Sequence, residues 1–253
     1  MLPPKNQHGQ HDRISVVLVS PRNPLNIGAA ARAMANFGFR QLTIVAPYEP
    51  NWLETKSAIG AEDLLQTARR TATLAEAISN CTLVVGTGTL TWRKPEQQVV
   101  QLPDLVPLVD SELARHGRIA IVFGPEKHGL TRDDLARCHC LVEIPTDPRQ
   151  PSMNLGQAVA VCLYELAVRC ANEETIPPAQ PTAKRMAAGK DLELLAGVVE
   201  EAMAASNYRP IVSSQANARE LRVMLRRLAP TERDARRILG VFRRILWRLK
   251  QTR

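Results

Sequence analysis

Residues 16–32 read VVLVSPRNPLNIGAAAR, and they decide the fold: an apolar strand runs into a turn of Ser, Pro and Asn and then into an alanine-rich helix. Two further segments have the same form, IAIVFGPEKHGL at residues 119–130 and LVEIP at 141–145, which is followed by SMNLGQA at 152–158. A strand that ends in such residues presents backbone N–H and C=O groups at its carboxyl edge, where open α/β sheets bind ligands. Three such ends predict one composite pocket.

Strands and helices are expected to alternate through the first two thirds of the chain. The expected strands cover residues 14–19, 42–46, 83–85, 119–123 and 141–144, and the expected helices cover 26–37, 57–69, 73–78, 103–115, 131–137 and 155–170. This alternation predicts an α/β domain at 13–171, a mainly parallel sheet with helices on both faces. We expect a disordered tail at 1–12 and, from three prolines, a linker at 172–183.

The last part of the chain, residues 184–253, predicts a small all-helical domain. Helices are expected at 191–204, 215–228 and 231–249, where apolar residues recur at helical spacing. Residues 205–253 hold 13 Lys or Arg and 3 Asp or Glu, a formal charge of +10, whereas residues 1–204 hold 20 and 22, a charge of −2. This asymmetry favours a polyanionic partner for the C-terminal segment. The alternative is a solvated basic tail.

Composition places the chain among ordinary globular proteins, with 45% hydrophobic and 23% charged residues in a length of 253. No run approaches 18 apolar residues, so no membrane span is expected, and residues 1–12 lack the apolar core of a signal peptide. The five cysteines form an odd set without disulfide-like spacing. We therefore expect reduced thiols and a cytoplasmic protein.

Two local features have competing interpretations. Cys138, His139 and Cys140 suggest a metal, but structural zinc takes four ligands and no second pair is apparent, so no metal site is expected. Trp92 and Trp247 are candidates for stacking on bases. Because Trp247 flanks the apolar stripe of the last helix, we expect it to pack in the core.

The three strand-and-turn segments together resemble the motifs of the SpoU (TrmH) branch of the SPOUT RNA methyltransferases. The resemblance covers residues 14–170 and includes NIGAAAR at 26–32, FGPE at 123–126 and SMNL at 152–155. Within that branch, VVGTGT at 84–89 and the basic tail are similar to TrmJ-type tRNA 2′-O-methyltransferases. The chain departs from them at Gly156, where Ser or Ala is usual, and in the run TLTW at 89–92.

The resemblance implies a SPOUT fold with a C-terminal trefoil knot, a homodimer, and S-adenosylmethionine as the methyl donor. Carried over by motif, the donor-binding residues would be Thr87, Gly88, Thr89, Gly124, Ile144, Pro151, Ser152, Met153 and Asn154. Arg32 takes the catalytic position, with Asn23 and Ser152 assisting by hydrogen bonds. A guanidinium is seldom neutral, so Arg32 would orient the 2′-hydroxyl and neutralise a phosphate as readily as activate the hydroxyl. Glu126 is expected to hold the turn or a dimer contact.

The expected function is S-adenosylmethionine-dependent 2′-O-methylation of a tRNA ribose, at an anticodon-loop pyrimidine such as position 32. The RNA contacts are assigned to Arg22 and to four arginines of the last helix, Arg233, Arg237, Arg244 and Arg248, which share a face opposite its apolar stripe. Two alternatives stay open: a ribosomal RNA 2′-O-methyltransferase, and a catalytically silent RNA-binding protein of the same fold.

Overall fold

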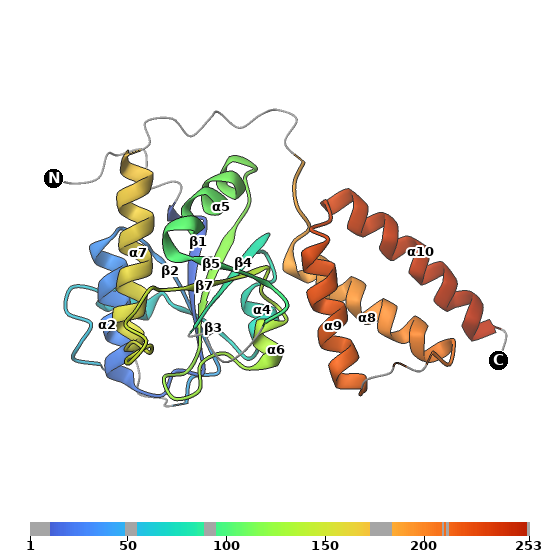
Figure 1. The fold of residues 1–253 in the computed structure, drawn as a ribbon, viewed down its shortest axis with the longest axis horizontal. Helices are drawn as coiled ribbons and strands as arrows, with labels where there is room; N and C mark the ends of the chain where they lie inside the picture. The colour runs from blue at the N-terminus through green and yellow to red at the C-terminus, as the bar shows by residue number, and fades with distance from the viewer. Residues whose placement is uncertain are drawn as a thin grey trace.

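A parallel sheet organises the first part of the molecule in the computed structural model, which describes residues 11–48, 55–88, 95–172, 184–208, 210 and 213–251 (Figure 1). Among these residues the sheet has seven strands in the order β3-β2-β1-β6-β4-β7-β5, and all neighbours are parallel. The strands are β1 (Ile14–Val19), β2 (Gln41–Val45), β3 (Arg69–Thr71), β4 (Leu83–Thr87), β5 (Gln98–Gln101), β6 (Ile119–Phe123) and β7 (Cys140–Glu143). The predicted α/β class is confirmed.

Helices cover both faces of this sheet. They are α2 (Pro24–Asn36), α3 (Glu62–Gln66), α4 (Leu74–Ala77), α5 (Leu102–Ala114), α6 (Arg132–Leu135) and α7 (Leu155–Asn172). Alternate residues of β1 point to opposite faces: Val16 and Leu18 join a core with α2, α5 and α7, whereas Val17 and Val19 join a smaller core with α4 and α6. The central strands are buried on both faces, which explains their continuous apolar sequence.

The chain turns from β1 into α2 through a local cap. Asn23 is the N-cap, where its side chain accepts from the backbone N–H of Leu25, and Pro24 occupies the first turn. At the other end Gly38 has φ +78°, in the left-handed region that glycine adopts without strain after a helix. The C-terminal end agrees with the sequence-based prediction, whereas the helix begins at Pro24, two residues before its expected start at residue 26.

Two edge elements differ from the prediction. The expected helix at 57–69 is only α3, because Gly60 has φ +76° before it and the chain then forms β3. Strand β5 was not expected at all. Both are short edge strands with mostly exposed side chains, so they lack the apolar run by which buried strands are recognised.

Three helices follow the sheet domain: α8 (Gly189–Ala205), α9 (Ser214–Arg227) and α10 (Glu232–Gln251). We call them the helical unit. Its core contains Leu195, Val199, Leu221 and Leu225, against which Leu239 and Phe242 of α10 pack. At the start of α10, Thr231 Oγ1 accepts from the backbone N–H of Asp234 and donates to its carboxylate.

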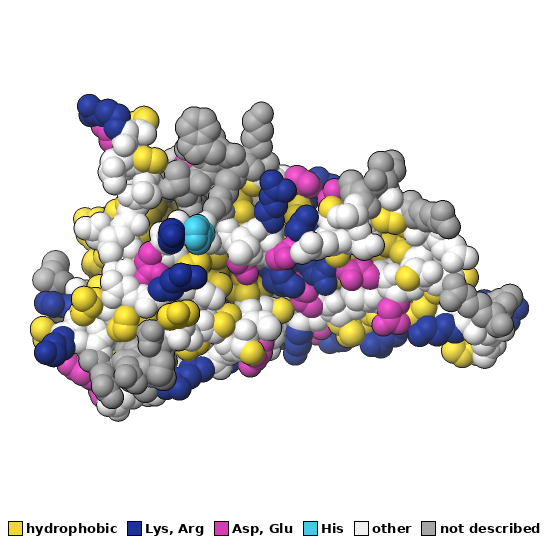
Figure 2. All heavy atoms as spheres, turned by 90° about the horizontal axis from the view of Figure 1, so that it is seen from below, with side chains coloured by type: hydrophobic (Ala, Val, Ile, Leu, Met, Phe, Trp, Pro, Cys, Tyr) yellow, Lys and Arg dark blue, Asp and Glu magenta, His cyan; other side chains and the backbone are white. Residues whose placement is uncertain are grey.

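The helical unit is docked against α4 and α6 of the sheet domain (Figure 1). Backbone N–H groups of Gly189 and Lys190 donate to Cys81 O and Ser79 O, at 2.9 and 3.0 Å. A Cβ on Gly189 would lie 2.6 Å from Ile78 O, so this approach requires glycine. Where the two parts meet, Figure 2 shows basic and acidic side chains side by side.

The predicted tail and linker fall largely outside the described residues. His11, at the end of that tail, is buried and stacks on Phe39 with 4.2 Å between ring centroids. In the described part of the chain no helix combines the length and the apolar character that a membrane span requires.

Candidate active site

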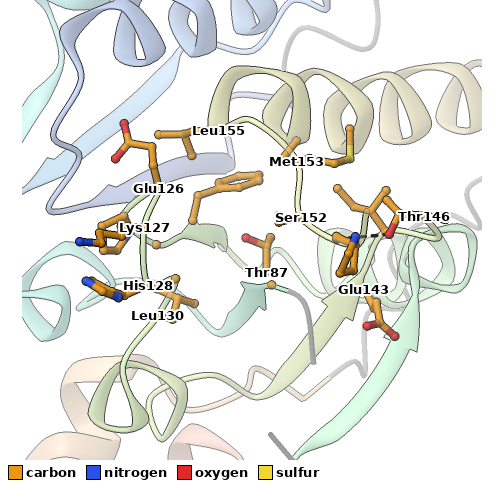
Figure 3. A pocket seen from close by; sticks show the side chains of 18 of the residues that line it. Thr87, Glu126, Lys127, His128, Leu130, Glu143, Thr146, Ser152, Met153 and Leu155 are labelled. Atoms are coloured by element: carbon orange, nitrogen blue, oxygen red, sulfur yellow. Dashed lines mark hydrogen bonds between the residues drawn. The ribbon is translucent and has the colours of Figure 1, made fainter. Parts of the chain in front are cut away.

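A cavity of about 260 Å³ opens at the carboxyl ends of the central strands β6, β4 and β7 (Figure 3). Seven residues assigned to the methyl donor from the sequence line it: Thr87, Gly88, Gly124, Ile144, Pro151, Ser152 and Met153. In Figure 3, Glu126, Lys127 and His128 lie on one side of the cavity and Thr146, Ser152 and Met153 lie on the other. Two of the three predicted strand ends, those after β6 and β7, thus line a pocket together with the end of β4, at the edge where parallel sheets bind ligands, whereas the segment at 16–32 does not line it.

Two glycines shape this cavity in different ways. A Cβ on Gly124 would lie 2.3 Å from the backbone of Gly129 and Leu130, so the loop after β6 folds back on itself only because that side chain is absent. A Cβ on Gly88 would meet nothing within 4 Å. The space against the Gly88 backbone is thus open to a ligand.

Glu126 ties the loop after β6 to the start of α2. Its carboxylate accepts hydrogen bonds from the backbone N–H groups of Arg22 and Asn23, both at 3.2 Å, and from Asn26 Nδ2 at 2.9 Å. Burial on its own raises the pKa of Glu126, but these hydrogen bonds outweigh it and hold the pKa below its ordinary value. Glu126 therefore stays ionised and holds the turn, as expected from the sequence.

Asn26 connects all three motif loops, and sequence reasoning missed it. Its Oδ1 accepts from Asn154 Nδ2 at 2.8 Å while its own Nδ2 donates to Glu126. Asn154 Oδ1 in turn accepts from the backbone N–H of Gly156 at the start of α7. A chain of side-chain contacts thus fixes the first turns of α2 and α7 relative to the cavity.

The remaining predicted residues lie around the cavity. Asn154 is outside its lining, and Asn23 is exposed and caps α2. Arg32 is exposed on α2 and does not line the cavity in this chain. Thr89 falls outside the described residues. The structure therefore groups most of the predicted donor residues together and leaves Arg32 apart from them.

The predicted RNA-binding arginines lie in two places. Arg22 is exposed beside the first motif, with its guanidinium 5.5 Å from the ring centroid of Tyr48. The four arginines of α10, Arg233, Arg237, Arg244 and Arg248, are all exposed. The core position expected for Trp247 is wrong: its side chain is 44% exposed, because it stands off the buried stripe that contains Leu246.

Cys138, His139 and Cys140 are part of the packed interior. Burial raises the pKa of Cys138 to about 12 and of Cys140 to about 11, so both thiols stay protonated. Burial, helped by the nearby Arg226, lowers the pKa of His139 to about 3, and its Nδ1 accepts from the backbone N–H of Val84. Over the described ranges no three His, Cys, Asp or Glu side chains are grouped as metal ligands would be.

Comparisons with known proteins agree with this architecture. A TrmJ from Pseudomonas aeruginosa (strain UCBPP-PA14), a tRNA (cytidine/uridine/adenosine-2′-O-)-methyltransferase, is 43% identical over 61% of this chain and 60% of its own length. A TrmJ from Klebsiella pneumoniae is 32% identical over 94% of this chain and 96% of its own. This chain thus spans under two thirds of the first relative but nearly all of the second.

Solved structures share the fold. The crystal structure of TrmJ from Z. mobilis ZM4 superposes with a TM-score of 0.79 at 30% identity, covering 91% of this chain and 98% of that one. The AdoMet complex of the SpoU methyltransferase AviRb from Streptomyces viridochromogenes has a TM-score of 0.50 at 20% identity, over 62% of this chain and 58% of that one. The latter likeness concerns the fold alone.

The parallel sheet, with a cavity lined by the loops after β6 and β7 and by the end of β4, defines an α/β methyltransferase domain of the SPOUT type. The sequence profile of the SpoU rRNA Methylase family matches residues 13–164. The chain belongs to that family.

Proposed function

We propose that the protein transfers a methyl group from S-adenosylmethionine to a ribose 2′-hydroxyl of tRNA, at an anticodon-loop pyrimidine such as position 32. The observation that carries the proposal is the cavity of about 260 Å³ that the loops of the second and third motifs line together with the end of β4. The names of the relatives support tRNA as the substrate. Both are called tRNA 2′-O-methyltransferases, and the matches cover 60% and 96% of their own lengths.

The cavity suits the donor in its chemistry. Apolar side chains, Leu130, Ile144, Met153 and Leu155, line it and suit an adenine ring. The open backbone at Gly88 and the loop at Gly124 offer N–H and C=O groups for polar recognition.

In the reaction the donor supplies an electrophilic methyl group: its carbon–sulfur bond breaks as the 2′-oxygen–carbon bond forms, and the hydroxyl proton leaves to solvent. We assign Arg32 to orienting the ribose and neutralising the adjacent phosphate, because a guanidinium offers several hydrogen-bond donors in a fixed planar arrangement. Ser152 is exposed at the cavity and is assigned to hydrogen bonding with the ribose. The homodimer and the trefoil knot remain predictions from the family resemblance.

The test uses unmodified tRNA and methyl-labelled S-adenosylmethionine, followed by digestion to nucleosides. We expect label on the 2′-oxygen of a pyrimidine nucleoside. Arg32→Ala should lower the rate by about 10²- to 10³-fold, because one positive group that stabilises developing charge is lost, while calorimetry shows unchanged donor binding. Arg40→Ala, exposed and outside the motif, is the control. Label on a base instead of ribose refutes the assignment.

A ribosomal substrate is the second candidate, because the family profile is described as that of an rRNA methylase. Ribosomal RNA presented alongside tRNA in the same assay separates the two. If the ribosomal RNA incorporated as much methyl label as the tRNA or more, ribosomal RNA would be assigned as the substrate in place of tRNA.

A further inference from the structure

Helix α10 has two different long sides. One side packs into the helical unit through Ala235, Leu239, Phe242 and Leu246. The opposite side carries the exposed arginines Arg233, Arg237, Arg244 and Arg248. At 3.6 residues per turn these four positions fall within about 60° of one another around the helix axis. They therefore form one continuous basic strip along the helix.

Trp247 lies beside this strip and outside the core of the helical unit. Its side chain is 44% exposed, and the guanidinium carbon of Arg244 lies 4.2 Å from the centroid of its ring. This distance is that of a cation–π contact, which orients the ring on the helix surface. An indole held in this way, next to positive charge, is the combination that proteins use to bind unpaired nucleotides.

Gly240 leaves the same side of the helix bare two turns before Trp247. A Cβ at this position would meet nothing within 4 Å, so packing does not require glycine here. Glycine is also the weakest helix former after proline. Its effect on this surface is to expose backbone between the basic residues, where a ribose–phosphate chain can approach closely.

We propose that this side of α10 binds an unpaired stretch of RNA, with one base stacked on Trp247 and the flanking phosphates on the arginine strip. We call it the α10 platform, defined by Arg233, Arg237, Gly240, Arg244, Trp247 and Arg248. The proposal rests on RNA being the substrate, as proposed above. The partner is a polyanion because residues 205–253 carry a formal charge of +10. An indole adds affinity for a nucleic-acid base, whereas a polyanion of carboxylates has no base to stack on it.

In Figure 1, α9 lies between the sheet domain and α10, and the C-terminal end of α10, which carries Trp247, points away from the sheet. RNA bound there is held away from the cavity where methyl transfer takes place. Trp247 is therefore a binding residue rather than a catalytic one. Its loss is expected to raise KM for RNA and to leave kcat and donor binding unchanged.

The test compares two labelled probes on the full-length protein, an oligouridylate of about 12 nucleotides, within the usual span of a single-strand site, and an abasic ribose–phosphate chain of equal length. Trp247→Leu should weaken oligouridylate binding by about 5- to 150-fold, the range found for loss of one stacked base. Binding of the abasic chain should not change, because it offers phosphates and no base. Trp247→Phe keeps an aromatic ring and should retain most of the affinity.

Ile245→Ala is the matched control, since Ile245 is 43% exposed on the same helix but away from the arginine strip. Salt titration adds a second readout: Trp247→Leu should leave the slope of log affinity against log salt unchanged, whereas Arg237→Gln should flatten it by about 0.7 for one lost single-strand phosphate contact.

The stacking proposal is overturned if Trp247→Leu binds oligouridylate as tightly as the wild type does. It is also overturned if the variant loses equal affinity for oligouridylate and for the abasic chain, since that result would assign Trp247 a structural role. Competition by polyglutamate as effective as that by oligouridylate would make the surface a general anion site and would also overturn it. A wild-type protein that binds oligouridylate through Trp247 but methylates no ribose contradicts the proposed function alone.

Discussion

Replacing Arg226 by alanine should separate the helical unit from the sheet domain. Arg226 lies on α9, and only 1% of its side chain is exposed. Its Nε donates to the backbone carbonyl of Arg137 at 2.8 Å, and one terminal nitrogen donates to Glu193 at 2.9 Å. One side chain thus joins the end of α6 to both α8 and α9.

The expected loss of stability follows from the burial of Arg226 and from the contacts that Glu193 keeps in the variant. Removing one partner of a buried ion pair costs about 3–5 kcal/mol. Glu193 keeps Arg222, whose Nε lies 3.0 Å away, so we expect the lower end, about 3 kcal/mol. For a chain of this size that corresponds to about 6–12 °C in Tm. Arg227→Ala is the control, because the next residue is exposed and its loss should change stability by no more than about 0.5 kcal/mol.

Thermal melting by circular dichroism at neutral pH is the assay, with the double variant Arg226→Met/Glu193→Leu as a further arm. The double variant should lose less than the sum of the two single variants, because neither Arg226 nor Glu193 is left buried without the other. Burial on its own raises the pKa of Glu193, but Arg226 and Arg222 outweigh it and hold the pKa below the ordinary value. The ion pair therefore stabilises the fold at neutral pH, and this contribution is lost as the pH falls from about 4.5 through the folded-state pKa. If Arg226→Ala and Arg227→Ala melt at the same temperature, the docking argument is wrong.

Two further predictions concern the cavity. The Gln side chain in Glu126→Gln cannot accept all three hydrogen bonds, so amide hydrogen exchange at Arg22 and Asn23 should accelerate. Because the pKa of Glu126 is lowered, the wild type should resemble the variant only once the pH falls below the ordinary glutamate range. Unchanged exchange in the variant would contradict the role of Glu126 in holding the turn. Gly124→Ala would bring a Cβ to 2.3 Å from the backbone of Gly129 and Leu130, so donor binding should be lost together with about 1–3 kcal/mol of stability. The control is Gly197→Ala on α8, where a Cβ would meet nothing within 4 Å, and it should stabilise the protein by about 0.5–1 kcal/mol. Donor affinity retained in Gly124→Ala would count against the assigned pocket.

The central strands could be predicted from sequence because burial on both faces makes them apolar without interruption. Strand β1 was predicted with its observed bounds, Ile14–Val19, and so was β6, Ile119–Phe123. The edge strands β3 and β5 could not be predicted from the sequence, because most of their side chains face solvent. Their pairing with β2 and β7 also depends on residues that are distant in sequence. The bounds of the central strands β1 and β6 were thus predictable, those of β2, β4 and β7 were predicted to within one or two residues, and the sheet order was not predicted.

Within the site, the choice between Asn23 and Asn26 shows what a motif leaves open. The resemblance assigned Asn23 to assist the reaction, but in the structure Asn23 precedes a proline at the first helical position and is the N-cap of α2. The contacts of Asn26 with Glu126 and Asn154 join segments 100 and 128 residues apart. Only the folded chain brings those segments together.

Helix α6 connects the cavity to the helical unit. Leu130 and Leu135 line the cavity at either end of this short helix, and Thr131 caps it through a capping box with Asp134. Just beyond its last turn, the carbonyl of Arg137 accepts from Arg226, which is 89 residues away in sequence. Because α6 has only four residues and its last one, Leu135, lines the cavity two residues before Arg137, we expect a displacement of α9 to shift the cavity wall. Donor affinity should therefore fall in Arg226→Ala together with stability, and it should stay unchanged in Arg227→Ala, where the contact to α6 is intact.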